Sequence, residues 1–193
     1  MGRPRNTEAR RAQIVDGMLT VMAEDGYAGA SIQAIARAAG LSSGLIHYHF
    51  DSKLDILLAL LASIAARLQT RYQHRRPDDG DPWASVCAWI DAHLALDDDA
   101  DPRAVACWVQ IGGEALREPQ VRDAYQQALQ ADYEPLLASV RALGGDDASA
   151  AAVMSAVQGA FQLSTAAPPI IPPGSAAATV RKMAAGLLGE TAA

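Results

Sequence analysis

SIQAIARAAG at residues 31–40 is followed directly by LSSGLIHYHFDSK at residues 41–53. Gly40 separates two short segments of helix-forming residues, and Ser31 and Ser42 stand where each helix would begin. The second segment presents small, hydroxyl-bearing and aromatic side chains in place of an apolar stripe. Two short helices joined by a tight glycine turn form a helix-turn-helix, whose second helix normally enters the major groove of DNA.

The rest of the chain also predicts helices, because alanine and leucine dominate it and alternation with a period of two is rare. We therefore expect an all-α fold of about nine or ten helices. An N-terminal three-helix domain carries the helix-turn-helix, and a helical domain follows it. The expected helices lie at about residues 7–25, 31–40, 43–50, 52–74, 83–96, 102–118, 119–143, 149–166 and 176–188.

Charge is distributed unevenly along the 193 residues, whose formal net charge is -6. Residues 1–11 carry four arginines against one glutamate, whereas residues 54–193 carry 10 basic and 17 acidic side chains. A basic tip on an acidic body is typical of a DNA-binding head joined to a body that does not bind DNA. We expect domains at residues 1–50 and 51–193.

Other classes of protein find little support in the sequence. No nucleophile elbow, phosphate loop, paired catalytic carboxylates or metal-ligand spacing is present, so we expect no enzyme, cofactor or metal. Cys87 and Cys107 are predicted to be buried free thiols. The N-terminus lacks the apolar core of a signal peptide, so we expect a cytoplasmic protein. The acidic run at residues 97–101 predicts a solvated loop.

Residues 148–180 carry no charge and are numerous enough to cross a bilayer. Alanine, serine, glutamine, threonine and glycine make up most of this run, which is interrupted by four prolines at residues 168–173. Such a composition favours a helix that packs tightly against another helix, and no membrane partner is expected.

The second short helix has the properties needed to approach DNA. Ser42, Ser43 and Gly44 let its N-terminal backbone come close to phosphates. Ile46 and Phe50 would form the inward face. The side chains expected on the DNA face or beside it are Leu45, His47, Tyr48 and Lys53. Spacing alone leaves open a helical bundle that never touches nucleic acid.

The segments IARAAGLS at residues 35–42 and GLIHYHFDSK at residues 44–53, preceded by Gly26-Tyr27, resemble the TetR family of bacterial transcriptional regulators. The resemblance covers residues 7–57, about a quarter of the chain. It implies that three residues lie near the DNA backbone: Ser31, Gln33 and Ser42. It also implies that Ser43, Leu45 and Tyr48 face the bases. His47 and Lys53 are the phosphate contacts that it implies.

Two positions depart from the family pattern. The family often has tyrosine where this chain has His47, and threonine where it has Leu45. The apolar Leu45 could contact a thymine methyl group where the family's threonine offers a hydroxyl. Because of these two departures, the sequence does not decide which bases are contacted. Arg3 and Arg5 form a candidate arm for the adjacent minor groove, the alternative being a tail without defined contacts.

The family further implies a helical body that dimerises and usually holds a small-molecule pocket. The pocket candidates mix apolar walls with a few polar groups, and ordinary core is the alternative: Trp89, His93, Cys107, Trp108, Ile111 and Glu114. The candidates for a four-helix dimer interface, with packing inside one chain as the alternative, are Tyr125, Leu129, Tyr133, Leu136, Val140, Val153, Val157 and Phe161.

The expected function is that of a repressor that binds a palindromic operator in double-stranded DNA as a homodimer. A small-molecule effector of unknown identity would release it. The alternatives are a helical sensor or interaction protein without sequence-specific DNA binding, and an activator of the same family. Nothing in the residues decides between repressor and activator.

Overall fold

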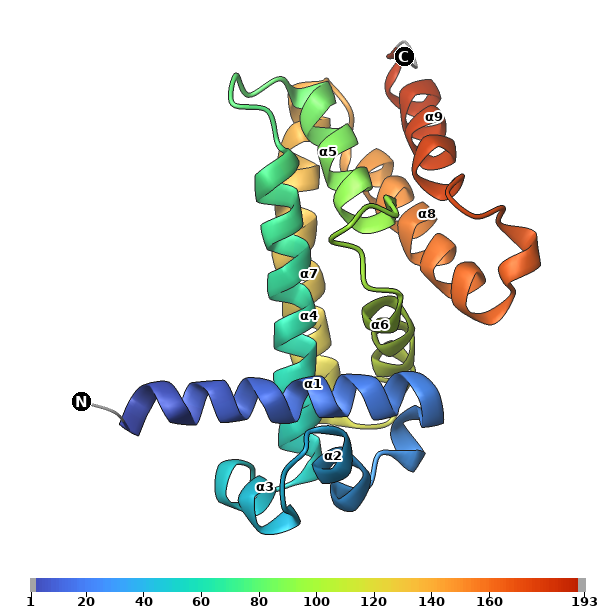
Figure 1. Cartoon of the computed structure of the whole chain (residues 1–193). Coiled ribbons are helices and arrows are strands. Elements are labelled where there is room, and N and C mark those ends of the chain that lie inside the picture. The colour runs from blue at the N-terminus through green and yellow to red at the C-terminus, as the bar shows by residue number, and fades with distance from the viewer. Residues whose placement is uncertain (1–2, 191–193) are drawn as a thin grey trace. The chain divides into compact units, whose positions relative to one another are not determined.

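A computed structural model describes the backbone of residues 3–190 and the side chains of residues 7–190. The described part contains helices only, which confirms the predicted all-α fold (Figure 1). Its elements are α1 (Arg3–Gly29), α2 (Ile32–Ala38), α3 (Ser43–His49), α4 (Lys53–Arg75), α5 (Pro82–Leu94), α6 (Pro102–Glu114), α7 (Pro119–Ala142), α8 (Asp147–Ala166), the 3-10 helix η1 (Pro168–Ile170) and α9 (Ala176–Leu188).

The chain divides into two compact units. The head unit runs to Ile64 and also contains Asp101–Tyr125, so it holds α1 to α3, the first half of α4, and α6. The body unit contains Ala65–Ala100 and the chain from Gln126 onward, including α5, most of α7, α8 and α9. The segment carrying α6 thus belongs to the same unit as the helix-turn-helix and packs against α1, although it lies far from both in sequence.

In the head unit, α2 and α3 lie side by side against α1 (Figure 1). Ile14, Met18 and Met22 of α1 are fully buried, as their helical spacing predicts. Gly17 permits the close approach of α1 to α2, because a Cβ there would lie 2.9 Å from the carbonyl oxygen of Ile35. The core of the head therefore requires glycine at this position.

Residues in the loops fix the ends of the short helices. Ser31 Oγ accepts a hydrogen bond from the Ala34 amide at 3.1 Å, and Ser42 Oγ accepts one from the Leu45 amide at 3.3 Å. These are the N-caps that the sequence predicts. Gly40, with φ 64°, makes the turn between α2 and α3 in a conformation that other residues rarely adopt.

The sequence predicted that the helix beginning at Pro102 would extend to Glu118, and this was wrong, because α6 ends at Glu114. Two consecutive glycines at residues 112–113 weaken the helix, and Pro119 disfavours helical backbone at the residue before it. Arg122 of α7 donates hydrogen bonds to the carbonyls of Ala115 and Leu116, which satisfies backbone groups of the turn.

In the body unit, two residues of α5 contact one residue of α7. The indole Nε1 of Trp89 donates to the Asp132 carbonyl at 3.0 Å, and His93 Nε2 lies 2.9 Å from the Asp132 carboxylate. Pro135, inside α7, has no amide hydrogen and interrupts the helix hydrogen bonds near this contact. The contacts of Trp89 and His93 with Asp132 therefore join α5 to one turn of α7.

The acidic loop after α5 is ion-paired rather than simply solvated. Arg71 donates to Asp97 at 2.8 Å, and Arg75 donates to Asp99 at 2.9 Å and also to Asp97. Both arginines belong to the last turns of α4, and their side chains are only 11% and 19% exposed. This network attaches the loop to α4 within the body unit.

The described residues lack sites of two other kinds, a membrane span and a metal cluster. No helix in residues 3–190 combines the length and the apolar character that crossing a membrane requires. The described side chains also contain no group of three or more histidines, cysteines, aspartates or glutamates placed to hold a metal ion.

Gly17→Ala is expected to destabilise the protein by about 1–3 kcal/mol, because the added methyl group overpacks the contact between α1 and α2. Chemical unfolding measures the change. Gly113→Ala is the matched control, since a Cβ there meets nothing within 4 Å. It should leave the stability unchanged or raise it by about 0.5–1 kcal/mol. Equal stability of Gly17→Ala and the wild type would contradict the proposed close approach.

Asp99→Asn is expected to lose stability at neutral pH and to lose less as the solution is acidified. Hydrogen bonds from Arg75 lower the pKa of Asp99 from 3.8 to about 2. A depressed carboxyl pKa stabilises the fold above the unfolded pKa, and the gain disappears as the pH falls from about 4 to 2. Because the Asp99 side chain is 46% exposed, we expect only about 0.5–1 kcal/mol.

Urea unfolding between pH 7 and pH 3 measures this difference. Asp98→Asn is the control, because Asp98 is exposed in the same loop. A deficit of Asp99→Asn that stays constant across this range would show that the ion pairs do not cause it.

Candidate nucleic-acid interface

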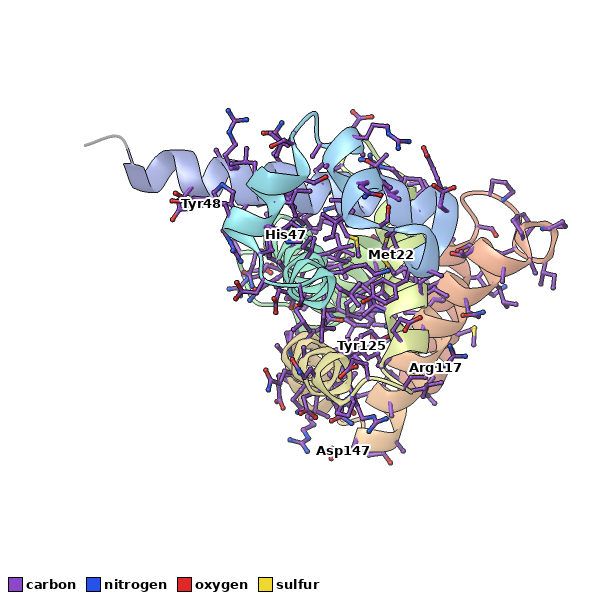
Figure 2. The ribbon with its side chains drawn as sticks, turned by 90° about the horizontal axis from the view of Figure 1, so that it is seen from below. Met22, His47, Tyr48, Arg117, Tyr125 and Asp147 are labelled. Atoms are coloured by element: carbon purple, nitrogen blue, oxygen red, sulfur yellow. The ribbon has the colours of Figure 1, made fainter. Side chains whose placement is uncertain are left out.

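The second helix of the helix-turn-helix, α3, has one buried and one exposed face. Ile46 is fully buried and Phe50, which follows the helix, is 4% exposed, as predicted for the inward face. His47 is exposed and Tyr48 is 71% exposed. Figure 2 shows both labelled side chains on this helix, with Tyr48 extending away from the ribbon. An exposed tyrosine and histidine on a well-packed helix can both donate and accept hydrogen bonds at a partner's surface.

The other residues predicted to lie near DNA fall into two groups. Ser31, Gln33, Ser42 and Gly44 are exposed, and Ser43 and Leu45 are half-buried. The hydroxyls of Ser31 and Ser42 already accept from backbone amides, and each retains a hydroxyl hydrogen to donate. A Cβ at Gly44 would meet nothing within 4 Å, so no side chain covers the start of α3. Contacts between these residues and DNA remain a prediction.

Arg11 and Gln13 of α1 hold the C-terminal ends of both short helices, a role that the sequence analysis missed. Gln13 donates to the carbonyl of Ala39 at 2.6 Å. Arg11 donates to the carbonyl of His49, and its guanidinium lies 3.9 Å from the centre of the Phe50 ring. The position of Arg11 in a basic segment indicated only a positive charge.

Lys53, predicted to contact a phosphate, already has an internal partner. Its ammonium donates to the carbonyl of Tyr27 at 2.6 Å and lies 4.0 Å from the centre of that ring. Partial burial lowers the pKa of Lys53, and the charge of Glu114 opposes this effect. The lysine therefore links the start of α4 to the chain that leads from α1 into α2.

Arg3 and Arg5 begin α1, but their side chains lie outside the described residues. The predicted minor-groove arm therefore stays a prediction.

The six residues predicted for an effector pocket belong to both units. Trp89 and His93 are buried in the body unit, where their rings lie 4.1 Å apart. His93 Nδ1 lies 2.8 Å from the carbonyl oxygen of Trp89, in addition to the contact of Nε2 with Asp132. A neutral imidazole has one N–H, so which of the two ring nitrogens donates depends on the tautomer. The sequence gave no indication that Asp132 is the partner.

The remaining four lie on α6 in the head unit. Cys107 and Ile111 are fully buried, Trp108 is 3% exposed and Glu114 is half-buried. The ring of Trp108 lies 4.8 Å from that of Tyr125, and burial raises the pKa of Cys107 to about 12. The thiol is therefore protonated at neutral pH, as expected of a buried free cysteine. Effector contact by these residues remains a prediction.

The residues predicted for a dimer interface are largely buried inside this one chain. Five of the eight are at most 3% exposed, and these are Leu136, Val140, Val153, Val157 and Phe161. Tyr125, Leu129 and Tyr133 are half-buried. The large apolar side chains that are exposed on α8 and α9 are instead Leu163, Met183 and Leu187.

Comparison with known proteins agrees with this arrangement. Residues 14–60 match the family model described as bacterial regulatory proteins, tetR family. Residues 82–189, more than half of the chain, match the model described as BetI-type transcriptional repressor, C-terminal. The chain belongs to the TetR family.

Relatives of this TetR-family chain include two regulators of the same name. The HTH-type transcriptional regulator BetI of Rhizobium meliloti is 33% identical over 143 residues, which cover 72% of this chain and 68% of that protein. The regulator of the same name from Paraburkholderia xenovorans is 28% identical over 60% of this chain. In that match the chain spans 59% of the relative's length.

Solved structures share the fold. A transcriptional regulator from Rhodococcus sp. Rha1 superposes with a TM-score of 0.84 at 23% identity, covering 93% of this chain and 96% of that one. A protein from Saccharomonospora viridis, solved in complex with choline, gives a TM-score of 0.77 at 23% identity, covering 94% and 96%. At these identities the likeness establishes the TetR-family fold alone.

Proposed function

We propose that this chain is a transcriptional repressor that binds a palindromic operator as a homodimer and leaves it when a small molecule binds. The observation that carries the proposal is the two-sided α3 helix, whose buried Ile46 fixes it while His47 and Tyr48 remain exposed. In this proposal residues 1–50 bind DNA and residues 51–193 bind the effector and form the dimer.

The proposed DNA contacts follow the burial of the side chains. Tyr48 and Leu45 would meet base edges, with Leu45 placed for a thymine methyl group. His47 and the hydroxyls of Ser31 and Ser42 would contact the DNA backbone and so fix the position of the protein on the duplex. Lys53 would supply a phosphate contact at the end of the same surface.

For the effector we propose a small quaternary ammonium compound of the choline type. A structural neighbour was solved with choline, and the C-terminal family model is of the BetI type. Aromatic side chains recognise such cations through their ring faces. Each unit of this chain contains a close pair of aromatic rings, Trp89–His93 in the body and Trp108–Tyr125 in the head.

Two other candidate functions remain, and each makes a different prediction. An activator of the same family would bind the same DNA, and transcription from a reporter promoter would rise. A helical sensor without DNA reading would show no sequence preference at any salt concentration. Catalysis is not part of the proposal, and the relatives are named as transcriptional regulators.

A mobility shift tests the proposal on DNA from upstream of the chain's own gene, with a scrambled duplex at matched salt as control. A specific shift that choline abolishes, while ethanolamine does not, would support both the operator and the effector. Equal binding to both duplexes, falling away together as salt rises, would refute sequence-specific regulation.

Tyr48→Ala is expected to weaken specific binding by about 1–3 kcal/mol with little effect on binding to scrambled DNA, because it removes a base contact. Lys53→Ala is expected to weaken binding to all sequences and to reduce the salt slope by about one. Fluorescence anisotropy at several salt concentrations measures both. If Lys53 acts only by holding Tyr27, Lys53→Ala lowers the affinity for DNA but leaves the salt dependence of binding unchanged. Unchanged affinity in both variants would refute the assigned surface.

Dimerisation is proposed through the exposed side chains of α8 and α9. Met183 and Leu187 lie four residues apart on α9 and share a face. On α8 the exposed positions include Ala152, Ser155 and Gly159, small residues that allow close helix packing. Light scattering at micromolar concentration should give a dimer for the wild type and a monomer for the double variant Met183→Glu/Leu187→Glu. A monomeric wild type would contradict the proposed dimer.

A further inference from the structure

The backbone of α1 is interrupted at Gly26, and one side chain of α6 bridges the interruption. Gly26 adopts φ 75° and ψ 171°, which breaks the regular helical pattern. Gln110 Nε2 donates to the carbonyl of Met22, before the break, at 3.0 Å. The amide of Tyr27, after the break, donates to Gln110 Oε1 at 3.2 Å. A single carboxamide thus holds both sides of the kink.

The backbone amide and the backbone carbonyl of Tyr27 form hydrogen bonds with side chains from two different helices. Gln110 from α6 accepts from its amide, and Lys53 from α4 donates to its carbonyl at 2.6 Å. Tyr27 leads into Ser31, the N-cap of α2. Figure 2 shows Met22 in the interior of the head, where it is fully buried. The direction in which the chain enters the helix-turn-helix is therefore fixed by two side chains from outside it.

We propose that Gln110 is a positioning residue for DNA reading, and that its carboxamide sets the angle of the α1 kink and so the placement of α2 and α3. This inference rests on the proposed function for its effect on operator affinity. Gln110 is the α6 side chain hydrogen-bonded to both sides of the break.

The two hydrogen bonds impose a chemical requirement that few side chains meet. The group must donate to a carbonyl and accept from an amide at the same time. A methionine has nearly the same length and offers no N–H or O–H to donate. A carboxylate accepts but cannot donate, and it would face the Met22 carbonyl. A protonated carboxyl group both donates and accepts, so it can replace the carboxamide.

This requirement defines the experiment. The variants Gln110→Glu and Gln110→Met are compared with the wild type as full chains between pH 5 and pH 8.5. The probe is a duplex selected by the wild type from a random library. We expect Gln110→Glu to bind about tenfold more weakly than the wild type at pH 8.5 and to approach it at pH 5. Gln110→Met should stay about tenfold weaker throughout.

The charged groups around this position set the pH range. Lys53 and Glu114 face Tyr27, and Glu118 also acts on that ring. Burial, Glu114 and the Met22 carbonyl raise the pKa of a carboxyl at position 110 above its ordinary value of about 4.3, and the ammonium of Lys53 opposes this rise. Each affinity is divided by that of the wild type at the same pH, so that pH effects common to all variants cancel. Gln127→Glu, at an exposed position on α7, controls for the added charge.

A second readout does not depend on DNA. Amide hydrogen exchange at Tyr27 should be faster in Gln110→Met, and in Gln110→Glu only at high pH. Wild-type affinity in Gln110→Glu at pH 8.5, or the same weakness in both variants at every pH, would overturn the proposal. Unchanged exchange at Tyr27 would overturn it as well. Absence of any DNA binding by the wild type would instead refute the proposed function, while faster exchange would still support the joint at Gly26.

Discussion

The helix-turn-helix depends on α1 to complete its two short helices. α2 and α3 contain seven residues each, far fewer than a helix needs to be stable alone in water. Their last carbonyls have no partner within the helix, and α1 supplies donors for both. Gln13 donates to Ala39 and Arg11 donates to His49. These contacts act together with the buried Ile46 and Phe50 to fix the orientation in which α3 presents Tyr48.

This dependence explains why the basic start of the chain is only partly available to DNA. Arg11 stacks on Phe50 and binds a backbone carbonyl, so its charge also stabilises the end of α3. Cations at helix C-terminal ends offset the negative end of the helix dipole. A count of basic residues therefore overestimates the number of side chains that are free to contact phosphates.

The sequence predicted those features that local chemistry decides. The caps at Ser31 and Ser42, the turn at Gly40 and the inward face of α3 follow from residue type and spacing, and the structure confirms them. Features that depend on distant partners were not predictable. Nothing near Gln110 in the sequence indicates Gly26, 84 positions before it, and nothing near His93 indicates Asp132.

For the body unit too, the sequence does not show which surfaces are covered by distant parts of the chain. Periodicity shows that Val153 and Val157 share a face of a helix, but it does not show whether another chain or the same chain covers that face. Both are at most 3% exposed within one chain. Residues 148–166 of α8 carry no charge, a composition that still indicates close helix packing, and the small exposed residues on the other side of this helix form part of the interface proposed for a second copy.

The polar groups of the body restrict what an effector can do there. The indole N–H of Trp89 and both ring nitrogens of His93 already lie within hydrogen-bond distance of acceptors. A ligand that formed a new hydrogen bond to either residue would leave a buried group unpaired, which costs about 1–3 kcal/mol. A quaternary ammonium group has no N–H to place and is attracted to ring faces and carboxylates without directional bonds. Such a cation would therefore leave the hydrogen bonds of Asp132 in place, but it would have to displace the packing around Trp89 and His93, which are 0% and 4% exposed.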